Sequence, residues 1–144
     1  MKTLLSLAII LFVSSCVTDN EPRELVGAGS KLPQFTVVTS AGDTVSSESL
    51  IGHESVITFF NTSCGDCRRE FPRLQQAMEE HPEVTFLCIA REEADSTIAA
   101  YWKANGLTLP YSPQPDRKVY SLFATAGIPR TYVVAPDLTV TACY

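Results

Sequence analysis

Hydrophobic residues between positions 56 and 80 follow two different spacings. Residues 56–60 form an unbroken run of β-branched and aromatic side chains, which predicts a strand buried on both faces. After a polar turn at 61–63, apolar side chains recur at helical spacing with charged residues between them: Phe71, Leu74 and Met78. This spacing predicts an amphipathic helix. His81-Pro82 is expected to end it, because the residue before a proline is disfavoured in helical conformation.

Similar patterns alternate along the rest of the chain. Strands are expected at 84–90, 130–135 and 139–144, and helices at about 95–105 and 117–125. Asp95 or Ser96 is expected to cap the first of these helices and Gly106 to end it, with a proline-rich loop after it. Residues 32–45 predict an N-terminal β-hairpin. Alternating strands and helices indicate an α/β fold whose mainly parallel sheet has both faces covered and an antiparallel hairpin at one edge.

The first residues have the pattern of an export signal. Lys2 is followed by an apolar run, Leu4 to Val13, which is too short to span a membrane. The residues Val13-Ser14-Ser15-Cys16 resemble a bacterial lipobox, which implies cleavage before Cys16 and a lipid anchor on that cysteine. The alternative is an ordinary signal peptide with a cysteine there by chance. The expected organisation is a signal peptide at 1–15, a lipid-anchored tether at 16–30 and a folded domain at 31–144.

The net charge limits the partners of the chain. The full sequence carries a formal charge of −5, and removing residues 1–15 makes it −6, because Lys2 is their only charged residue. An acidic protein is a poor partner for nucleic acid or for anionic lipid. Attachment to a membrane is therefore expected through acyl chains only.

Two of the five cysteines stand three residues apart where the first helix should begin, in Cys64-Gly65-Asp66-Cys67. This spacing allows two sulfurs to bond, and a helix N-terminus favours a thiolate on the first. Cys64 is the expected nucleophile and Cys67 the resolving thiol. The alternatives are an inert or vestigial pair and a structural zinc site, but for zinc the chain has only two histidines and no second CxxC pair.

The chain resembles the thioredoxin superfamily and, more narrowly, its membrane-anchored TlpA/ResA-type branch. The resemblance covers about residues 32–144 and depends on a small set of motifs: Phe59-Phe60, the CxxC pair, the run 68–72, residues 116–123 and Gly127-Ile128-Pro129. It implies a thioredoxin-like fold, with a central mixed sheet, helices on both faces and the N-terminal hairpin as an extension.

The resemblance also assigns roles. Pro129 would be a cis-proline facing the disulfide, and the Ile128 backbone would pair with a bound substrate strand. The alternative for Pro129 is an ordinary trans proline. Pro72 would be the proline inside the helix. Glu70 would assist deprotonation of Cys67; its alternative is a solvated carboxylate.

Three features depart from the family pattern. Ser63 replaces the tryptophan that usually precedes the first cysteine, and Thr58 replaces the buried aspartate of thioredoxin proper. The family also closes with a helix after its last hairpin, which is missing here because the sequence stops at Tyr144. Either the domain is shortened, or a partner or neighbouring copy hides part of the sheet.

In such a fold Cys88 and Cys143 would be three strand spacings apart, roughly 14 Å, which is beyond disulfide reach. Cys88 is expected to be a buried small hydrophobe, whereas Cys143 is near the end of the chain.

The expected function is that of an exported, lipid-anchored thiol–disulfide oxidoreductase on the periplasmic face of a bacterial membrane. It would exchange disulfides with protein thiols and use no metal or organic cofactor. Asp66 disfavours a thiolate on Cys64, which predicts a low reduction potential and a reductant re-reduced by a membrane donor. The alternatives on the same scaffold are a Sco-like copper carrier, which would need CxxxC, and a peroxiredoxin-like peroxidase, whose Pro-x-x-x-Thr-x-x-Cys pattern is absent.

Overall fold

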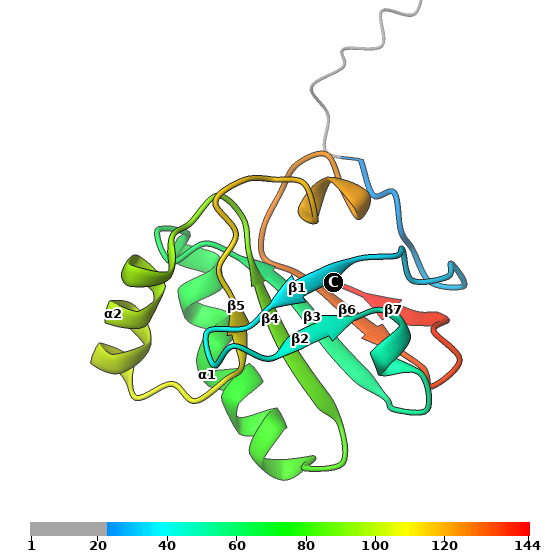
Figure 1. Ribbon diagram of the computed structural model, residues 1–144, viewed down its shortest axis with the longest axis horizontal. Coiled ribbons are helices and arrows are strands. Elements are labelled where there is room, and N and C mark those ends of the chain that lie inside the picture. Colours follow the sequence, from blue (N-terminus) through cyan, green and yellow to red (C-terminus); the bar gives the residue numbers. More distant parts are fainter. Residues whose placement is uncertain (1–22) are drawn as a thin grey trace, which may run out of the picture.

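The computed structural model describes residues 23–144, and its centre is a five-stranded mixed sheet (Figure 1). The strand order is β5-β4-β3-β6-β7. The strands are β3 (Ser55–Phe60), β4 (Thr85–Ala90), β5 (Tyr111–Ser112), β6 (Arg130–Val134) and β7 (Val140–Cys143). β3, β4 and β5 run parallel, whereas β6 and β7 are antiparallel additions on the other side of β3. The predicted strands and edge hairpin are confirmed.

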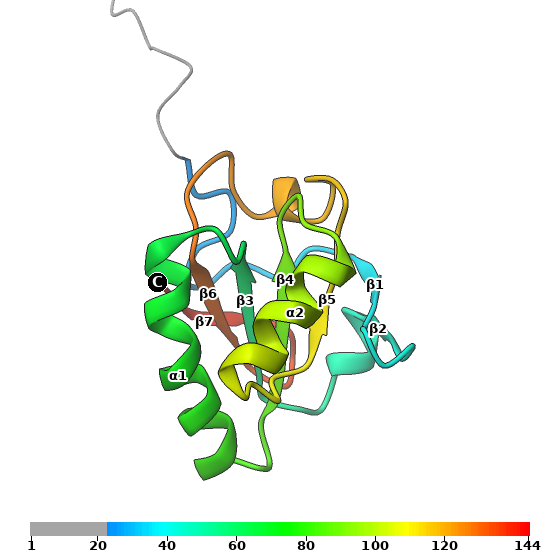
Figure 2. The same cartoon turned by 90° about the vertical axis from the view of Figure 1, so that its left-hand side faces the viewer.

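Both α-helices lie on one face of the sheet. α1 (Gly65–Glu80) and α2 (Asp95–Asn105) bury Phe71 and Trp102 in one apolar cluster with Phe60 of β3. The opposite face is covered by the hairpin of β1 (Thr36–Val38) and β2 (Thr44–Ser46) and by two 3-10 turns, η1 (Glu48–Leu50) and η2 (Tyr120–Leu122). Figure 2 shows α1 and this hairpin on opposite sides of the sheet. Helices therefore cover both faces of the sheet: α-helices cover one face, and 3-10 helices together with the hairpin cover the other.

The ends of α1 and α2 agree with the sequence except at one cap. His81 is the C-cap of α1, and Gly106 ends α2 in the left-handed conformation with φ 63°. The N-cap of α2 is Ala94, with no side-chain cap. The prediction of Asp95 or Ser96 was wrong, because the Asp95 carboxylate instead accepts a hydrogen bond of 2.9 Å from the Tyr111 hydroxyl.

Two other predictions around residues 107–125 also need correction. The helix expected at 117–125 is only the 3-10 turn η2, in which Tyr120 is buried and after which Phe123, its C-cap, is buried too. The expected proline-rich loop contains the short strand β5, which pairs with β4 through Cys88 and Ile89. A strand of two residues is too short to leave an alternation in the sequence.

The expected tether is partly folded onto the domain. Residues 16–22 lie outside the described part of the chain, as do Cys16 and the predicted leader. From Arg23 onwards, however, the segment contacts the residues after η2: the Leu25 amide donates to the Phe123 carbonyl at 2.9 Å, and Val26 is 4% exposed. Residues 25 and 26 of the expected tether thus contact the folded domain, and the boundary at residue 31 stays a prediction. No helix within residues 23–144 has the length and apolarity to cross a bilayer.

Cys88 and Cys143 lie in β4 and β7, with β3 and β6 between them. Both are unpaired thiols, and Cys88 is 2% exposed, as expected of a small core residue. Burial raises the pKa of Cys88 to about 12.

Candidate functional site

The site begins where β3 leaves the sheet. The turn after Phe60 is closed by the Asn61 side chain, whose Oδ1 accepts from the Ser63 amide at 2.9 Å. The Cys64 amide donates to the Asn61 carbonyl at 3.1 Å. These contacts place Cys64 as the N-cap of α1, in extended conformation, with the helix starting at Gly65.

Cys64 and Cys67 contact each other at the start of α1. Cys64 Sγ accepts a hydrogen bond from the Cys67 amide at 3.3 Å, and both thiols are unpaired. Cys64 is half-buried, whereas Cys67 has no exposed surface. Burial, helped by the side-chain hydrogen bond with Cys64, raises the pKa of Cys67 to about 12. Cys67 therefore stays a neutral thiol near pH 7, while Cys64 is accessible and receives a helix N–H.

The second wall of the site is the loop before β6. The Ile128-Pro129 peptide bond is cis, and the Ile128 carbonyl lies 3.6 Å from Cys64 Sγ, which donates to it. The Tyr120 hydroxyl holds the preceding Gly127 carbonyl at 2.7 Å. The loop reaches Cys64 because β6 pairs directly with β3. The cis bond that the resemblance implied is present, and Cys64 contacts both Cys67 and the Ile128 carbonyl next to Pro129.

Glu70 is the fifth residue predicted for the site. Its side chain is 34% exposed and pairs with Arg73 at 3.5 Å. Within residues 23–144, no hydrogen bond joins Glu70 to either cysteine of the pair. Its role as a base stays a prediction. Pro72 lies inside α1, as the resemblance implied.

Asp66, between the two cysteines, is not an isolated charge. Its carboxylate forms an ion pair with Arg69, one turn along α1, and both side chains are largely exposed. The guanidinium offsets part of the negative charge beside Cys64.

A neutral hydroxyl pair occupies the place of the buried aspartate. Thr58 is 1% exposed, and its hydroxyl bonds to that of Thr131 on β6 at 3.0 Å. Thr58 thus offers no carboxylate beneath the cysteine pair.

Sequence reasoning missed Glu93, which braces the turn before Cys64. This carboxylate is 8% exposed; it accepts from the Thr62 amide at 2.8 Å and contacts the Thr62 hydroxyl. The Thr62 carbonyl accepts in turn from the Arg68 side chain. A signal was present: Glu93 follows β4, and the carboxyl ends of adjacent parallel strands meet at one edge of a sheet.

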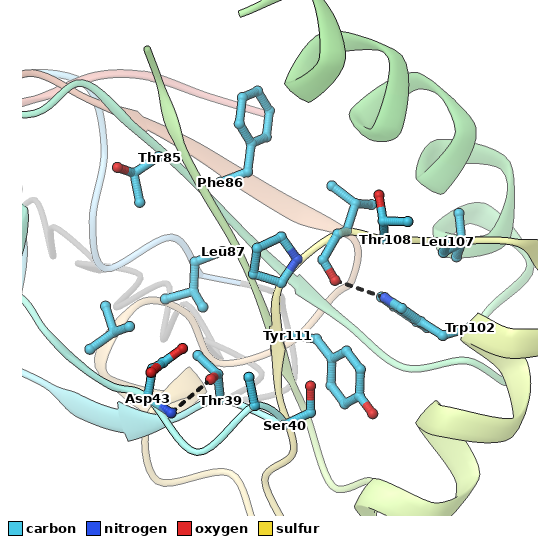
Figure 3. Close-up of a pocket in the computed structure, with 14 residues that line it drawn as sticks. Thr39, Ser40, Asp43, Thr85, Phe86, Leu87, Trp102, Leu107, Thr108 and Tyr111 are labelled. Atoms are coloured by element: carbon cyan, nitrogen blue, oxygen red, sulfur yellow. Dashed lines mark hydrogen bonds between the residues drawn. The ribbon is translucent and has the colours of Figure 1, made fainter. Parts of the chain in front are cut away.

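A pocket of about 470 Å³ lies apart from the sulfurs, between the hairpin, β4 and the end of α2 (Figure 3). Its apolar wall includes Trp102, whose Nε1 donates to the Leu109 carbonyl at 2.9 Å. No residue of the CxxC pair or of the Ile128-Pro129 loop lines it. Elsewhere in residues 23–144, no group of three or more His, Cys, Asp or Glu side chains converges as metal ligands would.

Comparison with known proteins agrees with this arrangement. The model of the AhpC/TSA family matches residues 28–143. The thiol-disulfide oxidoreductase ResA of Bacillus subtilis is 24% identical over 80% of this chain, which spans 65% of the length of that relative. A thio-disulfide isomerase from Thermus thermophilus is 30% identical, with a TM-score of 0.68, over 83% of this chain and 86% of that one. A thiol:disulfide interchange protein of the thioredoxin family from Chlorobium tepidum is 27% identical, with a TM-score of 0.70, over 81% and 85%.

Proposed function

Because the chain belongs to the AhpC/TSA family and has a thioredoxin-like fold, we propose that it is a thiol–disulfide oxidoreductase acting on protein disulfides. The observation that carries this proposal is the position of Cys64 Sγ. It lies at the start of α1, accepts the Cys67 amide and is 3.6 Å from the Ile128 carbonyl. Such a sulfur is accessible, receives a helix N–H group, and has a proposed resolving thiol one turn away.

In the reductive direction the reaction has two exchanges. The Cys64 thiolate attacks one sulfur of the substrate disulfide, so that a mixed disulfide forms and the first substrate thiolate leaves. Cys67 then loses its proton and attacks Cys64 Sγ, so that the Cys64–Cys67 disulfide forms and the second substrate thiolate leaves. Two electrons pass from the dithiol to the substrate. The two departing thiolates take up two protons, one equivalent to the proton lost by Cys64 on ionisation and one lost by Cys67. The high pKa of Cys67 keeps it protonated until the mixed disulfide has formed.

The substrate is proposed to dock along the Ile128 backbone. An extended segment beside this loop would pair through main-chain hydrogen bonds, which do not depend on substrate sequence. Ile128 and Pro129 are thus the proposed substrate-binding residues. Glu70, half-buried one turn after Cys67 on α1, is proposed to assist proton removal from Cys67 through a water molecule.

We further propose that the protein works as a reductant, exported and anchored by lipid on Cys16, and re-reduced by a membrane electron donor. Support for the direction comes from the negative charge of Asp66 between the two cysteines, which Arg69 offsets only in part. Support for export comes from the apolar run after Lys2 and the lipobox-like residues before Cys16.

Insulin reduction by the full chain, with dithiothreitol as donor, tests the activity. Wild-type protein should accelerate reduction, and Cys64→Ser should abolish the acceleration. Cys143→Ser is the matched control, since this thiol lies in β7 away from the site, and it should retain the wild-type rate. An unaffected Cys64→Ser protein would refute the proposal.

Equilibration with glutathione buffers tests the direction. A reductant should show a potential near or below that of thioredoxin, about −270 mV. A potential near −120 mV, typical of a strong oxidant, would overturn the reductive assignment but not the exchange activity. Copper titration of the reduced protein tests the alternative of a copper carrier. Peroxide consumption tests the alternative of a peroxidase.

A further inference from the structure

The N-terminal segment, residues 23–31, hydrogen-bonds to the residues that lead into the loop carrying Ile128 and Pro129. Figure 1 shows the first described residues beside the segment that leads into β6. Arg23 and Thr125 exchange two hydrogen bonds, from the Thr125 amide to the Arg23 carbonyl at 3.0 Å and from the Arg23 amide to the Thr125 hydroxyl at 2.8 Å. The backbones of Glu24 and Ala124 form an isolated antiparallel β-bridge.

Arg130 ties the two ends of this loop together. Its Nε and Nη2 both donate to the Ala126 carbonyl, at 3.1 and 2.7 Å, and its side chain is only 14% exposed. The guanidinium therefore spans the residues on either side of Gly127-Ile128-Pro129. Gly127 gives it room: φ is +89°, and a Cβ at that position would lie 3.4 Å from Arg130 Nη2.

Glu24 holds the guanidinium in this position. One carboxylate oxygen pairs with Arg130 Nη1 at 3.1 Å, and the other accepts from the Tyr132 hydroxyl at 3.0 Å. Both oxygens are thus engaged with β6, from a residue more than one hundred positions earlier in the chain. Without this carboxylate, a nearly buried guanidinium would lack a counter-charge and would be drawn towards water, away from Ala126.

We propose that Glu24 and Arg130 are positioning residues for substrate: Glu24 orients the Arg130 guanidinium, which sets the Ile128 carbonyl where an extended substrate segment pairs with it. This inference depends on the proposed oxidoreductase function. Neither residue touches the sulfurs or acts on the disulfide. Their effect is confined to substrates that use the loop backbone.

The test compares two substrates in exchange with the full chain. One is a disulfide-linked peptide long enough to pair with the loop, and the other is oxidised glutathione at concentrations far below saturation. Glu24→Gln keeps the length of the side chain and an acceptor for Tyr132 but removes the charge that holds Arg130. For the peptide, KM should rise about fivefold at unchanged kcat, the equivalent of ~1 kcal/mol for a partly exposed ion pair. The rate constant with glutathione should change less than twofold.

Arg130→Lys should raise the peptide KM to a similar extent, because a single ammonium group cannot reproduce the two bonds to Ala126 while pairing with Glu24. In the double variant Glu24→Gln/Arg130→Lys, the increase in KM should be no larger than in Arg130→Lys alone, since the two residues act through one contact.

Lys31→Gln is the matched control. Lys31 also ties the N-terminal segment to the domain, through a 3.2 Å ion pair with Asp137 and a 2.8 Å bond to Thr139, but at the turn between β6 and β7. This variant should leave both substrates' kinetics unchanged.

Parallel losses with both substrates, or an unchanged peptide KM in Glu24→Gln, would overturn the inference. Additive increases in the peptide KM in the double variant would also overturn the inference. A wild-type protein that exchanges neither substrate would instead refute the proposed function, so the two failures are distinguishable.

Discussion

The turn before Cys64 is predicted to depend on one buried carboxylate, that of Glu93. Glu93→Ala removes the acceptor of the Thr62 amide and the partner of the Thr62 hydroxyl, at a residue that is itself 4% exposed. A hydrogen bond to a charged group contributes about 1.5–3 kcal/mol, and an unsatisfied buried donor costs a comparable amount. We therefore expect a loss of about 3 kcal/mol in unfolding free energy.

Glu93→Gln is the matched variant. Its amide oxygen can accept from the Thr62 N–H while its amide nitrogen donates to the Thr62 hydroxyl, so the geometry survives with weaker bonds. The expected loss is about 1 kcal/mol, the difference between a charged and a neutral hydrogen bond.

Urea unfolding of the reduced protein measures both losses. Trp102 is the only tryptophan in the chain and is buried against Phe60 and Phe71, so its fluorescence reports on the helix-covered face of the sheet. A loss below 1 kcal/mol for Glu93→Ala would refute the reasoning. So would equal losses for Ala and Gln, because hydrogen-bonding capacity would then be irrelevant.

Three further predictions concern the thiols and the core. In Cys67→Ser, attacked substrates should remain bound to Cys64 as mixed disulfides that non-reducing gels resolve; their absence would contradict the two-step exchange. Because burial raises the pKa of Cys67 and of Cys88 from 9.0 to about 12, the unfolded thiols ionise first as the pH rises. The stability of the reduced protein should be complete below pH 9 and should fall between pH 9 and 12, by up to about 1.4 kcal/mol per pH unit for each thiol. Urea unfolding at a series of pH values measures this fall; Cys88→Val should reduce its slope by up to about 1.4 kcal/mol per pH unit, the share of one thiol, and an unchanged slope would argue against burial as the cause. Trp102→Phe should lower the unfolding free energy by about 2 kcal/mol in thermal or urea unfolding followed by circular dichroism, since the buried Leu109 carbonyl loses its donor; a loss near zero would mean that water replaces it.

Local pattern was sufficient for most of the elements. The apolar run of β3, the amphipathic spacing of α1 and the proline after His81 each act within a few residues, and all three are present as predicted. The CxxC pair falls in the same category, because the N-cap and first turn of one helix decide its geometry. The resemblance to thioredoxin-like proteins correctly implied the cis bond at Pro129.

The structure differs from the sequence-based expectation where the local pattern and the tertiary packing favour different conformations. Residues 117–125 have a helical pattern, but burying Tyr120 and Phe123 against the sheet leaves only a 3-10 turn. Residues 23–30 have the composition of a tether, yet Val26 reaches the core and Leu25 binds the Phe123 backbone.

The sequence by itself placed most of the strands, both α-helices and the CxxC pair at the start of the first of them. Only the tertiary structure decided what surrounds them. Glu93 braces Thr62 from 31 residues away, and Glu24 reaches Arg130 and Tyr132 across nearly the whole domain. The physical reason is that a carboxylate leaves no periodic trace in a sequence. Its importance comes from losing water beside a specific donor, and only the folded chain brings that donor to it.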